Sequence, residues 1–242
     1  MRVLVTRALD DARRTAGELA TRGHDALIAP LSEIRALDAP EPQLDGVQAV
    51  LATSSNGIRA FARVCRQRDI SVFAVGAYTA AAARAAGFLR VASADGDSTV
   101  LVAAVRKVLA AGTGALLHAT GKNGGQEFYR ELAEAGFDVR RCELYETVPC
   151  VQPPAEAVAA FRQRRIDAVL VLSPENGRML AETIQRAEVE PECAHLVACC
   201  ISAVAAAKLE NIGFGAIRIA EKPDLQCVLA LLDLGPIHTH GC

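Results

Sequence analysis

The chain has 242 residues, about twice the ~100 to 150 of a typical domain, so two domains are the first expectation. Hydrophobic residues make up 51% and charged residues 22%, which excludes a disordered or fibrous protein. The 26 Lys and Arg residues nearly balance the 28 Asp and Glu residues, and the net charge of −2 argues against a nucleic-acid partner. Apolar runs stay below the roughly 18 residues that cross a bilayer, and no signal-peptide pattern opens the chain, so we expect a cytoplasmic protein without membrane contact.

Short strand-like runs alternate with helical patterns along the whole chain, which predicts parallel α/β units. Residues 2–6 have the pattern of a buried strand, and a helical pattern follows that ends at Gly23. Residues 26–29 form the next predicted strand. The same order of strand, helix, glycine and strand returns in residues 116–142.

The chain also aligns with itself at two offsets. In the first alignment Gly23 matches Gly136, an offset of 113, and in the second Gly87 matches Gly213, an offset of 126. Two further strand–turn–helix units lie between the matched segments. The chain therefore has the pattern of one α/β half built twice.

Two linkers rich in proline and acidic residues, 30–42 and 143–154, each contain a short extended stretch. We interpret them as two crossings between domains. Domain one is then discontinuous, residues 1–34 and 148–242, and domain two, residues 35–147, is inserted in it. Each has the length of a flavodoxin-like parallel sheet covered by helices on both faces. The predicted fold class is therefore α/β, with two such domains joined by two extended crossings.

The eight cysteines include no Cys-x-x-Cys pair, and several lie in apolar strand patterns where a thiol behaves as a small hydrophobic group. Cys193, His195 and Cys199 are close in sequence, but alternation along a strand would separate them, so we interpret them as structural. His118 lies in a buried-strand pattern and is interpreted as a core residue. The turn at residues 121–125 has neither dinucleotide nor P-loop spacing. We therefore expect no metal, nucleotide or flavin.

In open parallel sheets, ligands bind at the carboxyl ends of strands, where the N–H groups of the following helices point outward. Here those positions are rich in Ser, Thr, Asn and Gly. Such residues cap helices, and if they open toward one cleft they also suit a ligand with many carboxylates. The candidate substrate-binding residues are Thr6, Arg7, Thr53, Ser54, Ser55, Asn56, Gly76, Ala77, Thr79, Gly121, Lys122, Ser173, Pro174 and Ser202.

Four segments, residues 3–7, 53–58, 72–76 and 144–148, together resemble the uroporphyrinogen-III synthase family. The resemblance covers nearly the whole chain in the right order. It implies a two-lobed, cofactor-free enzyme of tetrapyrrole (heme) biosynthesis. Such an enzyme is a cyclising lyase that converts linear hydroxymethylbilane into uroporphyrinogen III, with loss of water and inversion of the last pyrrole ring. It also implies a monomer that meets the preceding enzyme of the pathway transiently.

The resemblance places a tyrosine of the second crossing near the departing hydroxyl of the substrate, and this residue is Tyr145 here. We expect Tyr145 to act as a weak acid; packing between the lobes is the alternative. At residues 202–205 this chain has Ser-Ala-Val-Ala where family members often carry Gly-Pro-Thr-Thr, so a pair of hydroxyls is missing. A cytoplasmic two-lobed binding or sensor protein without catalysis is the alternative function.

Overall fold

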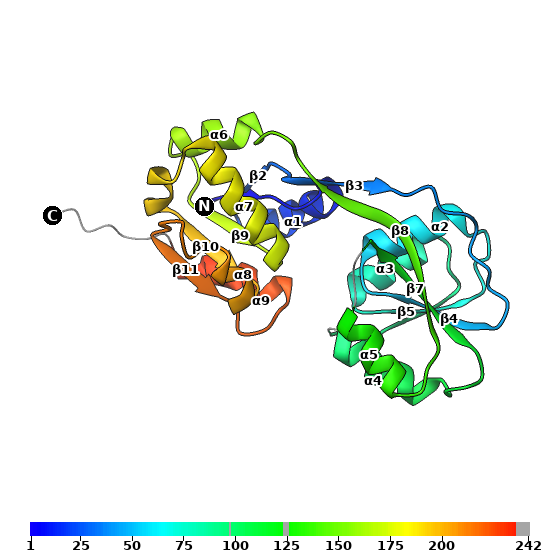
Figure 1. The fold of residues 1–242 in the computed structure, drawn as a ribbon. Coiled ribbons are helices and arrows are strands. Elements are labelled where there is room, and N and C mark those ends of the chain that lie inside the picture. Colours follow the sequence, from blue (N-terminus) through cyan, green and yellow to red (C-terminus); the bar gives the residue numbers. More distant parts are fainter. Residues whose placement is uncertain (97, 123–125, 236–242) are drawn as a thin grey trace. The chain divides into compact units, whose positions relative to one another are not determined.

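The computed structural model of the chain describes residues 1–96, 98–122 and 126–235. The chain forms two compact units (Figure 1): unit 1 contains Met1–Glu33 and Val148–Cys242, and unit 2 contains Ile34–Thr147. The chain passes between the units twice in extended conformation, through strand β3 (Ser32–Ala36) and strand β8 (Val139–Pro149).

Unit 1 has a sheet with the strand order β11-β10-β9-β1-β2, whose neighbouring strands pair in parallel. Its elements in chain order are β1 (Arg2–Val5), α1 (Leu9–Thr21), β2 (Asp25–Ile28), α6 (Ala155–Arg162), β9 (Ala168–Val171), α7 (Pro174–Ala187), the 3-10 helix η1 (Pro191–His195), β10 (Val197–Cys200), α8 (Ala203–Ala207), β11 (Ala216–Ile219), α9 (Leu225–Ala230) and the 3-10 helix η2 (Leu231–Leu234).

Unit 2 has a sheet with the order β3-β8-β7-β4-β5-β6, in which β8, β7, β4, β5 and β6 pair in parallel. Its elements, besides β3 and β8, are β4 (Val47–Ala52), α2 (Ser55–Val64), β5 (Ser71–Ala74), α3 (Ala77–Ala85), β6 (Arg90–Ser93), α4 (Ser98–Val108), β7 (Ala115–Gly121) and α5 (Gln126–Glu134).

The two units share one topology, entered at different strands. The strands of unit 2 can be numbered in chain order from β4, and those of unit 1 from β9, with the count continuing from β11 to β1 and β2. Both sheets then have the spatial order fifth, fourth, first, second, third. Read from its own start at β1, unit 1 has the flavodoxin-like order. The first sequence match joins β1 to β7 and the second joins β5 to β10, which are equivalent strands in this arrangement. The predicted fold class is confirmed.

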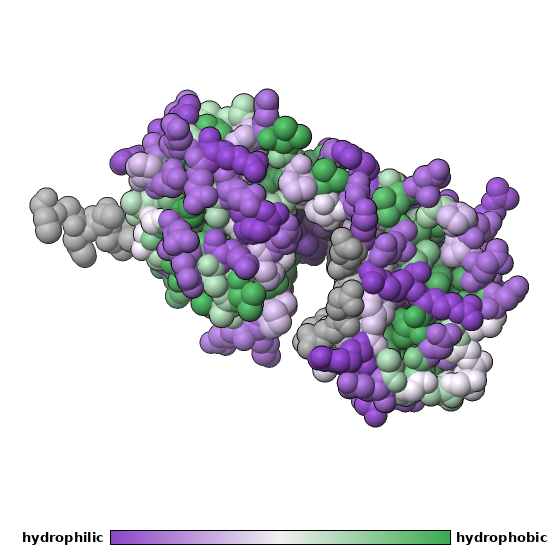
Figure 2. All heavy atoms as spheres, in the orientation of Figure 1, coloured by the Kyte–Doolittle hydropathy of each residue, from purple (hydrophilic) through white to green (hydrophobic). Residues whose placement is uncertain are grey.

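Helices cover both faces of each sheet, as buried parallel strands require. In unit 1, Val3 and Val5 pack with α1 and α9, whereas Leu4 between them packs with α6, α7 and α8. In unit 2, α2 and α3 pack on one face of the sheet and α4 and α5 on the other. Hydrophilic residues cover much of the surface seen in Figure 2, with hydrophobic residues scattered among them. None of the described helices combines the length and apolarity needed to cross a membrane.

Strand β8 differs from the sequence-based expectation. The sequence predicts a strand that ends at Cys142 and a separate extended stretch at residues 144–148, but the structure has one strand through both. On one side its register with β7 shifts at Gly121, which pairs with Tyr145. On the other side Leu37 donates its N–H to the Leu144 carbonyl at 2.9 Å. Pairing on both sides keeps the strand extended, so Tyr145 lies within the sheet.

Candidate functional site

At the carboxyl edge of the unit 2 sheet, Ser54 joins two elements. It follows β4 and caps α2, where its Oγ accepts a hydrogen bond from the Gly57 N–H at 3.0 Å. The same Oγ lies 3.0 Å from the hydroxyl oxygen of Tyr145 in β8. Because the Ser54 oxygen already accepts from Gly57, its own hydrogen is free to be donated to Tyr145.

Glycine at the end of β7 makes room for the Tyr145 ring. A Cβ at Gly121 would lie 2.8 Å from two ring carbons of Tyr145, so a side chain there would displace the tyrosine. The neighbouring Lys122 donates its N–H to the Tyr145 carbonyl at 2.8 Å. The Lys122 ammonium lies 4.0 Å from the carboxylate of Glu146, which also lies 3.9 Å from Arg35. Residues 123–125 of the predicted turn lie outside the described residues.

Thr53 is tied to a buried histidine. Its Oγ1 lies 2.8 Å from Nε2 of His118 in β7, and Nδ1 of that ring lies 2.6 Å from the Tyr129 hydroxyl of α5. Burial, together with a smaller effect of the Arg141 charge, lowers the pKa of His118 to about 4. Burial also raises the pKa of Tyr129. Both groups are therefore neutral near pH 7, and His118 is a core residue with both nitrogens hydrogen-bonded.

The turns after β4 and β5 are connected by Arg59 of α2. Its guanidinium donates to the Tyr78 hydroxyl of α3 at 2.6 Å and to Oδ1 of Asn56 at 3.4 Å. Gly76 caps α3 without a side-chain hydrogen bond. Ala77 is exposed and begins that helix, whereas Ser55 and Thr79 are buried and each only 5% exposed.

At the carboxyl edge of the unit 1 sheet, two serines cap helices. Ser173 follows β9 and accepts from the Asn176 N–H at 3.0 Å, with Pro174 in the first turn of α7. Ser202 follows β10 and accepts from the Ala205 N–H at 3.3 Å. Helix α8 is therefore capped by Ser202, although residues 202–205 lack the pair of hydroxyls that family members often carry there.

Thr6 and Arg7, which follow β1, are engaged within unit 1. Thr6 is 1% exposed, and its hydroxyl accepts a hydrogen bond from the Asn176 side-chain amide at 2.9 Å. Arg7 lies 3.6 Å from the carboxylate of Asp11. Thr6, like Ser55 and Thr79, therefore offers a ligand main-chain groups rather than a free side chain.

The sequence alone does not indicate that His118, Tyr129, Arg59 and Tyr78 are neighbours of the candidate residues. Arg59 and Asn56 are three positions apart on a helix, which is a usable local signal. The contact of Tyr129 with His118 depends on how α5 packs on the sheet, and no local pattern indicates it.

Within the described residues, no group of three or more His, Cys, Asp or Glu could hold a metal ion. Cys193 packs on one face of the unit 1 sheet and Cys199 on the other, so the two thiols do not converge. Burial raises the pKa of each to about 12 and keeps both protonated.

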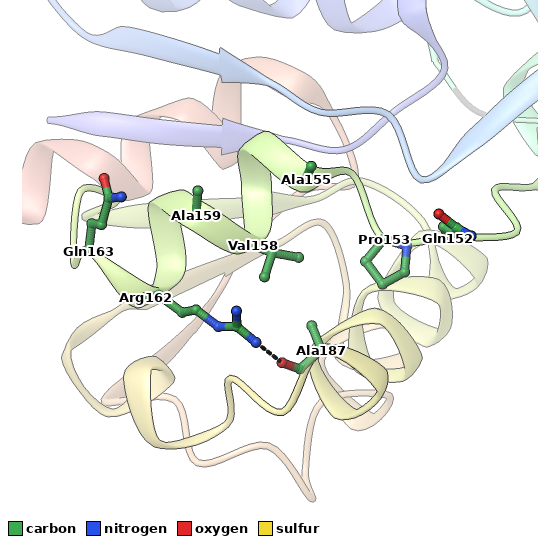
Figure 3. A pocket seen from close by; sticks show the side chains of 8 residues that line it. All are labelled: Gln152, Pro153, Ala155, Val158, Ala159, Arg162, Gln163 and Ala187. Atoms are coloured by element: carbon green, nitrogen blue, oxygen red, sulfur yellow. Dashed lines mark hydrogen bonds between the residues drawn. The ribbon is translucent and has the colours of Figure 1, made fainter.

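A hollow of about 530 Å³ in unit 1 lies along α6 and the end of α7, and Arg162 donates across it to the Ala187 carbonyl at 3.2 Å (Figure 3). None of the candidate residues lines it. A second hollow, of about 440 Å³, is lined by Arg59 and Tyr78 in unit 2.

A family model described as uroporphyrinogen-III synthase HemD matches residues 13–230. Among solved structures, the chain resembles uroporphyrinogen-III synthetase from Helicobacter pylori, with a TM-score of 0.61 and 18% identity over 97% of this chain and 100% of that one. It also resembles a mutant uroporphyrinogen III synthase from Thermus thermophilus, with a TM-score of 0.52 and 18% identity over 96% of each chain. No curated protein gives a significant match.

Proposed function

The chain belongs to the uroporphyrinogen-III synthase family, and from this premise we propose how its residues convert hydroxymethylbilane into uroporphyrinogen III. The reaction is a cyclisation with loss of water, which makes the enzyme a hydro-lyase. Family membership favours this enzyme over the binding or sensor protein considered from the sequence.

The first chemical step is loss of the terminal hydroxyl. As the C–O bond breaks, the pyrrole nitrogen supplies electrons and an electrophilic azafulvene is left. We propose that Tyr145 donates the proton that turns the departing hydroxyl into water. The observation that carries this proposal is the hydrogen bond of 3.0 Å between Tyr145 and Ser54. When Ser54 donates in that bond, it stabilises the phenolate that forms as Tyr145 gives up its proton.

The last ring then attacks the azafulvene through its substituted carbon, forming a C–C bond and a spiro intermediate. The original bond from that carbon to its bridge then breaks, which leaves a second azafulvene at the bridge. The free α-carbon of the last ring attacks this bridge and loses its proton, which restores the Tyr145 phenol, so the ring is inverted and the net change is loss of water. Because spontaneous closure gives the symmetric isomer instead, the enzyme must mainly impose geometry. The substrate carries an acetate and a propionate on each ring. Serine and threonine hydroxyls and main-chain N–H groups at helix N-termini are suited to hold these carboxylates. In unit 2 we assign this role to the turns after β4, β5 and β7, and in unit 1 to those after β1, β9 and β10.

The contact of Thr53 with His118 orients the Thr53 hydroxyl so that its hydrogen can be donated to the substrate. A phenol is a stronger acid than a neutral imidazole N–H, so we assign Tyr129 as the donor to Nδ1 of His118 at 2.6 Å. Nε2 then carries the ring proton and donates to Thr53 Oγ1 at 2.8 Å. The hydroxyl hydrogen of Thr53 is left to be donated to a carboxylate of the substrate.

We further propose that the two units are separate domains, residues 1–34 with 148–242 and residues 35–147. The separate sheets and cores support this assignment. We also propose a cytoplasmic monomer. Because its substrate cyclises spontaneously, transient contact with the enzyme that releases the substrate would limit loss to the symmetric product.

The function is tested by supplying freshly generated hydroxymethylbilane and separating the product isomers. Formation of the type III isomer above the spontaneous background is expected. Type I product alone, at the spontaneous rate, would contradict the proposal.

A further inference from the structure

Arg59 connects two turns of unit 2 at the carboxyl edge of its sheet. It lies in the second turn of α2, close to Asn56, and it reaches Tyr78 in the first turn of α3. The guanidinium carbon also lies 5.6 Å from the centre of the Tyr78 ring. The strands that precede these helices, β4 and β5, are neighbours in the sheet, so one cation is shared by two adjacent turns.

The hydrogen-bond partners of Arg59 are neutral. Its hydrogen bonds go to a phenol and to an amide oxygen, and no ion pair in the described part of the chain includes it. Arg178 of unit 1 is a contrast, because it binds the carboxylates of Glu175 and Glu182. A guanidinium has five N–H donors, and the two hydrogen bonds of Arg59 use two of them. A half-buried cation held in this way keeps its charge and several donors available for an anion.

The space beside Arg59 suits a carboxylate on a short hydrocarbon arm. Arg59 and Tyr78 line a hollow of about 440 Å³, within the size range of small-molecule sites. The other residues that line it are alanines: Ala81, Ala82, Ala85 and Ala86. The hollow therefore combines one positive, hydrogen-bonding end with an apolar wall, and this combination matches an acetate or propionate arm better than a bare inorganic anion.

We propose that Arg59 is a substrate-binding residue that pairs with one carboxylate of the tetrapyrrole, with Tyr78 fixing the orientation of the guanidinium. This inference rests on the proposed function, because that function supplies a substrate with a carboxylate arm on every ring. The planar guanidinium can bind the carboxylate through two parallel N–H groups, which an ammonium cannot do.

The test compares Arg59→Met, Arg59→Lys and Tyr78→Phe with Arg63→Met. Arg63 is an exposed cation in the last turn of the same helix and serves as the matched control. With freshly generated hydroxymethylbilane, Arg59→Met is expected to raise KM for type III formation about ten- to hundredfold, because a charge-assisted hydrogen bond to the substrate is lost. The kcat value should change less than about threefold. Arg59→Lys and Tyr78→Phe should raise KM less, and Arg63→Met should leave it unchanged.

Equilibrium binding of uroporphyrinogen III, an octacarboxylate, gives a second readout that needs no turnover. Arg59→Met should bind it about ten- to hundredfold more weakly than wild type, and added salt should weaken wild-type binding more than that of the variant. Equal affinity and equal KM in a folded Arg59→Met or Arg59→Lys protein would overturn the inference while the proposed function stands. A wild-type protein that binds the octacarboxylate but makes no type III isomer would overturn the function alone. Failure to bind it at all would overturn both.

Discussion

The hydroxyl groups of Ser54 and Tyr145 lie 3.0 Å apart, although 91 positions separate the two residues in the chain. The contact joins the N-cap of α2 to the strand through which the chain returns to unit 1. Gly121 makes it possible, because only a residue without a Cβ leaves space for the tyrosine ring at the end of β7. The N-cap of α2, the pairing of β7 with β8 and the proposed acid Tyr145 therefore meet at one point of the unit 2 sheet.

Replacing Tyr145 by Phe is expected to slow type III formation by ~10²-fold, the low end for a positioned general acid. The ring packing stays, so the melting temperature should change little. Initial rates with separated isomers, together with a thermal unfolding curve, measure both effects. Full activity in the Tyr145→Phe protein would mean that another group protonates the leaving hydroxyl.

Replacing Ser54 by Ala should lower kcat for type III formation roughly two- to tenfold, since the hydrogen bond to Tyr145 that it removes contributes about 0.5 to 1.5 kcal/mol. It should also cost about 1 kcal/mol of stability, because α2 loses its cap. Asp224→Ala is the matched control: it removes the cap of α9, where Asp224 accepts from the Cys227 N–H at 2.8 Å. If both variants lower kcat alike, the effect of Ser54 comes from stability and not from its hydrogen bond to Tyr145.

His118 should make the stability of the protein depend on pH. Its folded-state pKa of about 4 lies below the ordinary 6.5, so the unfolded chain binds more protons between these values. The stability contributed by neutral His118 is therefore present above about pH 6.5 and is lost as the pH falls toward 4. From pH 7 to pH 5 the loss is about 2 kcal/mol from this group.

Urea unfolding of wild type and His118→Gln at these two pH values measures this contribution, and the variant should lose less stability on acidification. Tyr129→Phe should keep the wild-type dependence, because burial is the main cause of the low pKa and this change leaves the histidine buried. An identical pH dependence in His118→Gln would show that other groups cause it.

Dialysis against a strong chelator is expected to leave type III formation unchanged. The thiols of Cys193 and Cys199 are buried on opposite faces of the sheet and stay protonated, which makes them poor metal ligands. Activity that disappears on dialysis and returns only with zinc or magnesium would contradict the cofactor-free mechanism.

A fragment of residues 32–149, which includes every strand of the unit 2 sheet, should fold on its own. It contains two apolar clusters that involve only its own elements. A cooperative unfolding transition followed by circular dichroism is the expected result. A fragment without that transition would mean that unit 2 depends on unit 1 and is not a separate domain.

Local features of this protein could be read from its sequence. Strand and helix patterns, the stop at Gly23 and the caps at Ser54 and Ser173 depend on residues a few positions apart. The inserted, doubled layout was also readable, because equivalent halves keep matching residues at constant offsets. The sequence therefore determined the fold class and the edges of the sheets at which polar residues gather.

Which of those polar side chains are available was decided by the tertiary structure. Thr6, Ser55 and Thr79 have the same residue types as candidates that are partly exposed, such as Thr53, Ser54 and Ser202, yet packing buries them. The orientation of a strand residue depends on register, and a shift of one residue reverses the face on which its side chain lies. The shift at Gly121, the path of β8 and the packing of α2 against α3 therefore determine that Tyr145 meets Ser54 and that Arg59 meets Tyr78. These contacts join residues distant in the chain, and no local pattern specifies them.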